Sequence, residues 1–565
     1  MFLNREFKSQ AREEETKVMN RCLFFLFLIG VCGLPLLSTS AHALSPKSEA
    51  PSLAPSKFAQ LRALKNQTQG GQVTSIDHID FKFIVGDLEA LLKTANQNQK
   101  EKKKRTWKRE DMLDLLEKMA DSRQPLPPSE LDTYLERDKL GKETTNPSII
   151  KNMLDSKDPK EQAIIRAVIA KMAREGKTAQ DIVERFTSVL VKLAAKKFHP
   201  GFLESEGQYN IVSIEVSPKS EPLDQVFSMV VEAYYDQALQ YAQISPNNDV
   251  KIGMTPSGIQ TMLKLIRQGV KVNSTLMFPD AQITEQNELD APQYVAVAEA
   301  YIQGLEDRVN DFLVQNGKLS EAKKAKALKK ILSPIVSVDS EFMSRGGVLV
   351  HGKKKGEPLK SDGKEFTIDN ADFAGKMPLE IAQAKLIYQI QQKIYNPGYR
   401  LPDELAGLKF TEKIEELSRR FKSLHDMGAN PKRLFLASTG SKKEQEEFMR
   451  SLYGNAWEYA YVQELIADGS LATHPPATYK KFNDSGDASR FTIADRLKMA
   501  REVVTQVSRI PGLIDAVSRQ LLKNGVEQFM KDHQSTLDLI NRVIQESGET
   551  RPAGQATTGA VNPAA

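Results

Sequence analysis

Cysteine is almost absent from this sequence of 565 residues. Its two cysteines, Cys22 and Cys32, both lie in one apolar segment near the start of the chain. If that segment is removed, the mature protein has no thiol with which to form a disulfide or to act as a nucleophile. Disulfide scaffolds and cysteine-dependent enzymes are then excluded.

The sequence also lacks the motifs of several common enzyme classes. It contains no Gly-x-Ser-x-Gly motif, no P-loop and no Gly-x-Gly-x-x-Gly after a predicted strand. Its histidines are scattered and do not show the spacing of metal ligands. The sequence therefore gives no support for a serine hydrolase of the α/β type, a P-loop enzyme, a dinucleotide-binding sheet or a histidine-based metal site.

Neither positive nor negative charge is in large excess, since the formal net charge is only +5. Two short basic runs, at residues 102–105 and 353–355, have Trp107 as the only nearby aromatic side chain. One ring is not a stacking surface for bases, so we interpret the runs as solvated loops and predict no nucleic-acid partner. The length allows two or three average domains, or one large α/β barrel with insertions.

The apolar segment that holds both cysteines is interpreted as a secretory signal peptide. It has a short basic start at Met19, an apolar core over residues 22–37 and an Ala-x-Ala site that ends at Ala43. The core is short for a transmembrane helix, so we predict cleavage after Ala43, export to the periplasm or the medium, and no stable membrane insertion afterwards. Residues 1–18 are charged and make a poor leader, which indicates that translation begins at Met19.

Composition divides the chain into four segments. The signal peptide over residues 1–43 is followed by a linker and N-terminal extension over residues 44–110, which is rich in polar and basic residues. Residues 111–546 form the main body. The tail over residues 547–565 is small, polar and rich in Pro and Gly, and it is expected to be disordered.

Helical and strand-like segments alternate through the main body. Such alternation implies parallel strands. Polar residues on successive strands are typical of a (β/α)₈ TIM barrel, which collects its catalytic groups at the C-terminal ends of the strands. We therefore predict an α/β barrel of this type, with extra helices and the N-terminal extension, in preference to a doubly wound open sheet. The predicted strands include residues 209–216, 331–337 and 433–440, and the polar residues are Asn146, Glu215, Lys251, Asn273, Ser333 and Ser438.

Lys251 is the most unusual of these polar residues. It follows Val250 in an apolar strand, and a helix-like segment over residues 259–266 separates it from the strand of Asn273. An amine held inside a barrel loses solvation, which favours the neutral, nucleophilic form that a Schiff base requires. The alternative is an edge-strand lysine whose amine reaches water.

Several segments resemble motifs of the transaldolase family, in that family's order, over most of residues 112–546. Residues 250–255 resemble its Lys-Ile-Pro-Ala-Thr strand, with Gly253 and Met254 in place of Pro and Ala. Further segments resemble the longer bacterial branch, so we identify the chain as an exported, divergent member of this family. The other similar segments are 144–148 (Thr-Thr-Asn-Pro-Ser), 213–216 (Ser-Ile-Glu-Val), 272–276 (Val-Asn-Ser-Thr-Leu), 294–306, 384–388, 436–442, 461–465 and 475–478.

The resemblance implies a class I aldolase-like barrel that transfers a dihydroxyacetone unit from a ketose phosphate to an aldose phosphate. It implies a sugar or sugar phosphate as the small-molecule partner, and no metal or organic cofactor. Lys251 would attack the ketose C2 carbonyl, Glu215 would pair with a water for proton transfers, and Thr275 would hold that water. The substrate-binding residues that the resemblance implies are Asn146, Asn273, Ser333 and Ser438.

A second carboxylate is needed to take the hydroxyl proton during C–C cleavage. Asp121, in Ala-Asp-Ser-Arg, resembles the aspartate on the first barrel strand of the family. Asp77, in Thr-Ser-Ile-Asp, is the alternative, and choosing it would make residues 81–140 a large insertion. Either aspartate taken alone can also be a helix N-cap or a residue of a solvated turn.

The phosphate-binding arginine of the family is expected just after the sixth strand, in a Ser-Arg-Val-Asp context. Residues 336–341 read Val-Ser-Val-Asp-Ser-Glu, without that arginine. Arg345, Lys442 and Lys443 are candidate substitutes. Losing a charged hydrogen-bond donor weakens phosphate binding by roughly 1.5–3 kcal/mol.

Two alternatives to full transaldolase activity follow from this gap. The first is a related aldolase that keeps the imine chemistry but acts on non-phosphorylated or smaller sugars. The second is a non-catalytic, exported binding or scaffold protein with the same fold. Retention of Lys251, Glu215 and Asn273 together favours an enzyme.

Overall fold

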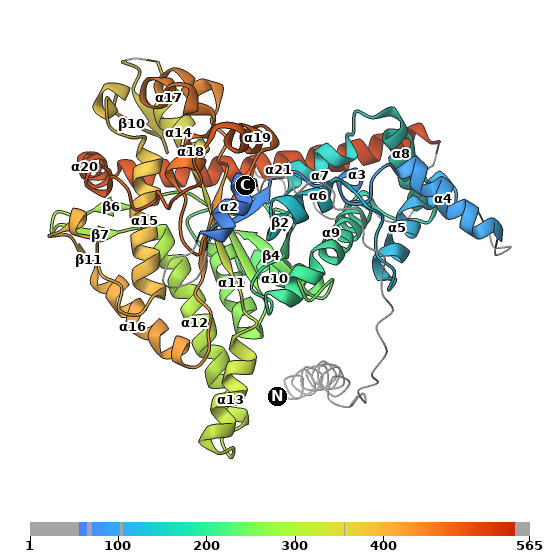
Figure 1. Cartoon of the computed structure of the whole chain (residues 1–565), viewed down its shortest axis with the longest axis horizontal. Coiled ribbons are helices and arrows are strands. Elements are labelled where there is room, and N and C mark those ends of the chain that lie inside the picture. The colour runs from blue at the N-terminus through green and yellow to red at the C-terminus, as the bar shows by residue number, and fades with distance from the viewer. Residues whose placement is uncertain (1–55, 65–70, 102–105, 355, 549–565) are drawn as a thin grey trace, which may run out of the picture. The chain divides into compact units, whose positions relative to one another are not determined.

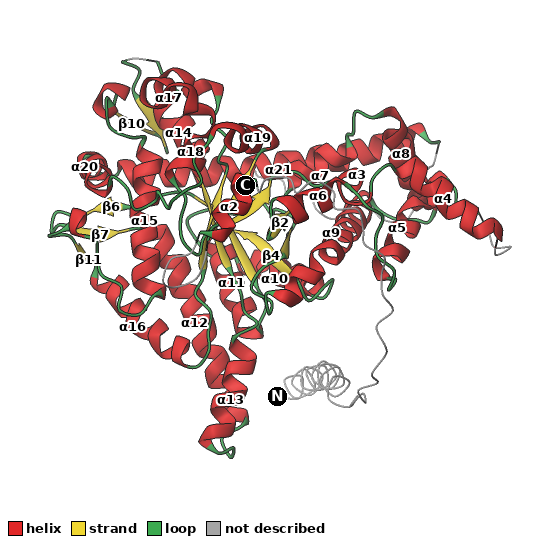
Figure 2. Cartoon of the chain, viewed as in Figure 1, coloured by secondary structure: helices red, strands yellow, loops and turns green. Residues whose placement is uncertain are grey.

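Eight parallel strands form one sheet in the order β1-β13-β12-β8-β5-β4-β3-β2 (Figure 1). The sheet closes between its two end strands, because the amide of Gly141, just before β2, donates to the carbonyl of Thr74 on β1 over 3.1 Å. Helices surround the strands (Figure 2), so the fold is a (β/α)₈ TIM barrel, as predicted. The strands are β1 (Val73–Ile76), β2 (Lys142–Thr144), β3 (Ile211–Glu215), β4 (Asn248–Gly253), β5 (Val272–Met277), β8 (Val338–Phe342), β12 (Arg433–Ala437) and β13 (Leu471–His474).

This computed structural model describes residues 56–64, 71–101, 106–354 and 356–548. The expected signal peptide and nearly all of the expected tail lie outside these ranges. No helix within them is long and apolar enough to cross a membrane. Two small sheets lie beside the barrel, one of β6 (Gln282–Ile283), β7 (Glu288–Asp290) and β11 (Lys409–Phe410), the other of β9 (Leu359–Ser361) and β10 (Lys364–Phe366).

The helices follow the strands in chain order. After β1 the chain forms a helical excursion, and each later barrel strand is followed by at least one helix before the next barrel strand. The last helix is the longest. The α-helices are α2 (Lys57–Ala63), α3 (Phe81–Val85), α4 (Leu88–Glu101), α5 (Met112–Asp121), α6 (Glu130–Arg137), α7 (Pro147–Leu154), α8 (Pro159–Arg174), α9 (Ala179–Glu204), α10 (Ser228–Ala242), α11 (Pro256–Gln268), α12 (Pro292–Gln315), α13 (Glu321–Leu332), α14 (Met343–His351), α15 (Leu379–Tyr395), α16 (Glu412–Asp426), α17 (Glu446–Tyr453), α18 (Ala460–Glu464), α19 (Pro476–Ser485), α20 (Leu497–Ser508) and α21 (Leu513–Glu546).

Successive side chains of each barrel strand point alternately outward and inward. On β4, Val250 and Ile252 belong to the main apolar core between strands and helices, so Lys251 between them points inward. The lower part of the interior holds a separate apolar cluster beside the buried ion pair of Lys142 and Asp249. Lys251 lies two residues beyond Asp249 on β4, towards the C-terminal ends of the strands. The cluster consists of Val73, Val338, Phe435 and Leu471.

The barrel begins earlier in the sequence than predicted. The boundary expected at residue 111 is wrong, because β1 lies inside the segment interpreted as an N-terminal extension. All of its residues are buried, and each pairs with β13. A strand of four residues with Thr and Ser at its centre shows little hydrophobic periodicity, so the sequence alone does not reveal it.

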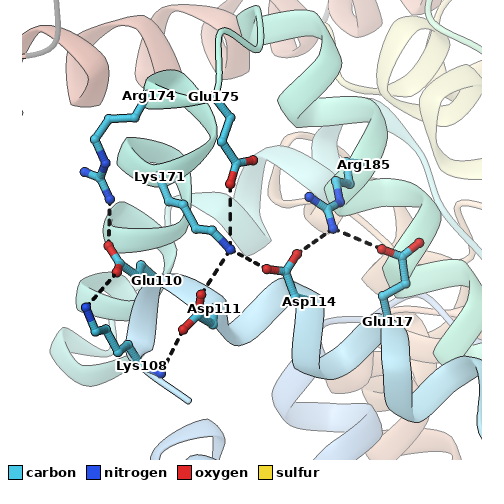
Figure 3. Close-up of polar contacts among 9 residues, drawn as sticks. All are labelled: Lys108, Glu110, Asp111, Asp114, Glu117, Lys171, Arg174, Glu175 and Arg185. Atoms are coloured by element: carbon cyan, nitrogen blue, oxygen red, sulfur yellow. Dashed lines mark hydrogen bonds and ion pairs between the residues drawn. The ribbon is translucent and has the colours of Figure 1, made fainter. Parts of the chain in front are cut away.

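Ion pairs attach the excursion after β1 to helices α8 and α9 (Figure 3). Lys171 of α8 lies 3.0 Å from Asp111 and also contacts Asp114. Arg185 of α9 lies 2.6 Å from Asp114 and 3.0 Å from Glu117. Acidic residues three apart share one face of a helix, so α5 presents its acidic face to these cations and packs outside the barrel.

The strand predicted over residues 331–337 is also wrong. Residues 331 and 332 complete α13, Ser333 caps that helix, and the sixth barrel strand, β8, begins at Val338. The apolar run belongs to the buried turn between helix and strand, whereas β8 itself carries Asp339 and Glu341. Because these two carboxylates interrupt the apolar pattern, the sequence did not indicate a strand here.

Asp339 and Lys432 form an ion pair that is buried between the sheet and its helices. Their side chains are 1% and 0% exposed, and the amine also donates to Oγ of Ser274 over 2.5 Å. Burial raises the pKa of Asp339, and the charge of Lys432 opposes that rise. Each partner therefore depends on the other for its charge.

Lys432→Met is expected to lower the free energy of unfolding by about 3–5 kcal/mol, because it leaves a carboxyl buried without its cation. Adding Asp339→Leu should restore most of the loss, since the unpaired group is then gone. Chemical denaturation followed by circular dichroism measures both. Lys480→Met, which breaks an exposed pair with Asp484, is the control and should change stability little. A double variant no more stable than the single one contradicts this account.

Candidate active site

Three polar side chains lie side by side inside the barrel. Glu215 of β3 is in register with Lys251 of β4, and Lys251 is in register with Asn273 of β5. Residues in register on parallel strands point the same way at the same height. The three side chains predicted from separate strands therefore form one layer.

The amine of Lys251 is buried, with 4% of the side chain exposed. It lies 3.3 Å from Oε2 of Glu215 and donates to the carbonyl of Thr145 over 3.3 Å. Both contacts are longer than a usual charge-assisted hydrogen bond. The amine is thus oriented by its neighbours without being locked to either of them.

Burial raises the pKa of Glu215 to about 7, while the charges of Lys251 and Arg345 lower it. Near neutral pH the carboxyl is therefore present in both its protonated and its ionised form. A carboxyl whose pKa lies near the working pH can donate and accept protons efficiently.

Asn273 is fixed by hydrogen bonds to β3 across the barrel interior and to the neighbouring strand β8. Its Nδ2 donates to Oγ of Ser213 over 3.0 Å, and its Oδ1 accepts from Oγ of Ser340 over 2.6 Å. Thr275, two residues along the same inward face, is fully buried, and its hydroxyl has no partner in the described chain. Unpartnered buried hydroxyls are uncommon, so Thr275 is free to bind a water or a substrate.

Asp77, rather than Asp121, stands at the end of the first barrel strand. It follows β1 directly, and its amide donates to the carbonyl of His474 on β13 over 2.8 Å. Burial raises the pKa of Asp77, and the charge of Lys251 is the largest effect that opposes the rise. The carboxyl of Asp77 therefore faces the same interior as the amine.

The prediction that Asp121 lies on the first strand is wrong. It is the last residue of α5, its side chain is 62% exposed, and it lies 3.4 Å from Lys192 on the outside of the barrel. Because the acidic face of α5 pairs with α8 and α9, this carboxyl is held away from Lys251.

Ser333 does not line the pocket either. It caps α13 before the strand begins, where its carbonyl accepts from Nδ2 of Asn430 over 2.5 Å. Ser340 of β8 is the serine of the sixth strand that points inward, since its hydroxyl bonds to Asn273. Sequence reasoning missed it because the strand was placed several residues too early.

The arginine that the sequence seemed to lack follows the true sixth strand. β8 ends at Phe342, and Ser344-Arg345 comes next, at the start of α14. Burial lowers the pKa of Arg345, and the nearby carboxyls of Glu215 and Asp77 are the main effects that raise it. The guanidinium therefore shares the barrel mouth with the two site carboxyls. The expectation that no arginine follows the sixth strand is wrong, and Arg345, one of the three candidate substitutes, stands there.

Ser438, directly after β12, holds the start of α14 in place. Its carbonyl accepts from the amide of Ser344 over 3.0 Å, and the two hydroxyls lie 2.9 Å apart. Its φ of +54° is unusual for a residue with a side chain. Such backbone geometry is often found at functional sites.

Asn146 lies between β2 and α7, where its Oδ1 accepts from the amide of Ile149 over 2.8 Å. Asn146 and Glu215 line a cavity that also reaches His533 and Thr536 of α21. Of the two lysines proposed as arginine substitutes, Lys442 is close enough to lower the pKa of Asp77. In the described ranges, no cluster of three or more His, Cys, Asp or Glu residues is placed to hold a metal ion.

Known proteins resemble this chain over most of its length. Residues 126–540 match the family model described as transaldolase/fructose-6-phosphate aldolase. The chain belongs to this family. It is 28% identical to transaldolase 1 of Streptomyces coelicolor over 72% of this chain and 86% of that protein. It is 26% identical to a transaldolase of Trichodesmium erythraeum over 75% and 93% of the two chains, and 27% identical to one of Mycolicibacterium smegmatis over 70% and 85%.

The family match begins after β1. Asp77 lies outside residues 126–540 because the helical excursion separates it from the rest of the barrel. The signal that finds Asp77 is its place directly after a short buried strand, Val73–Ile76, which is the arrangement that TIM barrels use for catalytic residues.

Replacing Lys251 by Met is expected to raise the pKa of Glu215 above 7, because it removes the cation that partly offsets burial. Infrared difference spectroscopy of the carboxyl band across a pH titration measures the shift. Lys264→Met, which removes an exposed cation paired with Glu232, should leave the titration unchanged. A lower pKa in the Lys251 variant would show that the two groups are not coupled in this way.

Proposed function

We propose that this chain is a transaldolase that transfers a dihydroxyacetone unit through a Schiff base on Lys251. The observation that carries the proposal is the layer of Glu215, Lys251 and Asn273 with Arg345 at the same mouth. A buried amine, a carboxyl that titrates near neutrality and an anion-binding guanidinium are what imine chemistry on a phosphorylated ketose requires.

In the proposed reaction, the neutral amine of Lys251 attacks C2 of the ketose. Glu215, through a water held at Thr275, donates the proton with which the carbinolamine loses its hydroxyl as water, and a protonated imine forms. Asn273, already fixed by Ser213 and Ser340, has donor and acceptor capacity left for a substrate hydroxyl.

Cleavage of the C3–C4 bond then needs a base for the C4 hydroxyl. We assign this role to Asp77. As Asp77 takes the proton, the C4 oxygen forms a carbonyl, the C3–C4 electrons move into the imine, and an enamine remains on Lys251. An aldose acceptor enters, the same steps run in reverse, and hydrolysis of the new imine frees the ketose product.

Arg345 favours a phosphorylated substrate over the unphosphorylated sugars of the first alternative. It makes no ion pair or hydrogen bond with another residue of the described chain, so its five N–H donors are available to an anion. The scaffold alternative is disfavoured, because a non-catalytic protein has no need to keep Lys251 and Glu215 buried at the energetic cost of desolvation.

Borohydride reduction with fructose 6-phosphate is expected to leave a stable adduct on Lys251, located by peptide mass mapping. Lys251→Met should give none, while Lys385→Met, which removes another buried amine away from the layer, should still label. Fructose without the phosphate should trap at least about tenfold less, because it lacks the charge-assisted bonds to Arg345. A folded protein that no ketose labels would refute the enzyme assignment.

Asp77→Asn and Asp121→Asn form a matched pair that tests the base. The first is expected to lower kcat by about 100-fold or more, because a general base in bond cleavage contributes at least that much. The second should leave kcat within about twofold, since exposed substitutions away from the site have small effects. Steady-state transfer between fructose 6-phosphate and erythrose 4-phosphate is the measurement. If Asp121→Asn lowered kcat strongly and Asp77→Asn did not, Asp121 would be the base instead.

A further inference from the structure

Helix α21 runs past the C-terminal ends of the barrel strands. It extends from α20 at one side to α8 at the other (Figure 1). Along the way it contacts β5, which carries Asn273 and Thr275, and α14, which carries Arg345. One helix therefore touches both the strand that binds the reacting end of the substrate and the segment that presents the guanidinium.

Arg345 lies within cation–π distance of two phenylalanine rings. Its guanidinium carbon lies 5.0 Å from the ring centre of Phe342 at the end of β8, and 5.7 Å from that of Phe529 on α21. The rings attract the cation without accepting classical hydrogen bonds from it, so its N–H groups remain available to an anion. Phe529 is 3% exposed, so its position is fixed by packing.

Gly525 sets how closely α21 approaches the barrel. A Cβ at this position would lie 2.8 Å from Cδ2 of Leu276 and 3.3 Å from Nη1 of Arg345. Glycine is otherwise unfavourable in a helix interior. Leu276, whose φ is +57°, follows Thr275 directly. The absence of a side chain at Gly525 therefore lets the helix pack directly against the strand that carries Thr275.

Asp532 connects the same helix to α7, the helix that follows the second barrel strand. It is 8% exposed and accepts a hydrogen bond from Oγ of Ser148 in α7, two residues after Asn146. Its charge also acts on Arg345. Gly525, Phe529 and Asp532 are spaced four and three residues apart and thus lie on one face of α21.

We propose that this face of α21 is the specificity element of the site. Phe529 is a positioning residue that holds the guanidinium of Arg345 at the barrel mouth, where its N–H groups can meet the substrate phosphate, and Gly525 sets the depth at which it does so. The inference rests on the proposed function for the identity of the anion as a phosphate group. It adds that a helix from the far end of the chain decides whether phosphorylated sugars are preferred.

The first test measures binding without chemistry. Titration calorimetry with inorganic phosphate should give a Kd about three- to tenfold weaker for Phe529→Leu than for the parent protein, because leucine keeps the bulk but loses the π face. Phe529→Tyr should restore the parent Kd. Met530→Leu, a change of similar size at the next position, is the control for general effects on the helix.

The second test separates substrates. Phe529→Leu should raise KM for fructose 6-phosphate by about the same three- to tenfold with little change in kcat, and leave borohydride trapping by dihydroxyacetone unchanged. Gly525→Ala should act in the same direction in both tests, with folding checked by its thermal melting.

The outcomes distinguish this inference from the proposed function. If Phe529→Leu binds phosphate as well as the parent, or if it impairs phosphorylated and unphosphorylated ligands equally, the inference is overturned. If no ketose reacts but phosphate binding follows Phe529, the proposed reaction fails while the positioning role stands.

Discussion

The candidate site depends on the burial of opposite charges inside the barrel. Lys251 and Glu215 lie 3.3 Å apart with almost no exposure to solvent. In water such a pair would be fully charged, with no reason to exchange protons near neutrality. Burial brings the pKa of Glu215 to about 7, and the strand register keeps both groups at one level of the barrel. The chemistry proposed for the site follows from this constraint.

Ion pairs outside the barrel interior attach helices to the strands. Asp339 and Lys432 are equally buried but face the surrounding helices, and their ion pair links the strands to those helices. The acidic face of α5 pairs with α8 and α9 at partly exposed positions and fixes the excursion after β1. Similar residue types therefore line the candidate site or attach helices to the barrel according to the direction in which a strand or helix points them.

Much of the site follows from sequence because its residues belong to local motifs. Lys251, Glu215, Asn273 and Thr275 lie on strands whose apolar pattern is clear, and the structure brings them together as the barrel prediction requires. Asp77 was only the alternative aspartate, Arg345 was only one of three candidate substitutes, and Ser340 was not predicted. The three cases have one reason. Their strands are short or carry carboxylates, so hydrophobic periodicity fails where tertiary burial, not local pattern, stabilises the strand.

The sequence by itself determined the barrel class and the family and singled out Lys251 in its apolar strand, because each depends on residues close together in the chain. Only the tertiary structure decided which aspartate enters the barrel, which arginine faces it and which helix covers it. Residues 77 and 345 and helix α21 are far apart in sequence, and closure of the sheet between β1 and β2 is what brings them to one mouth. Contacts of that range arise from packing of the whole barrel, which no local pattern encodes.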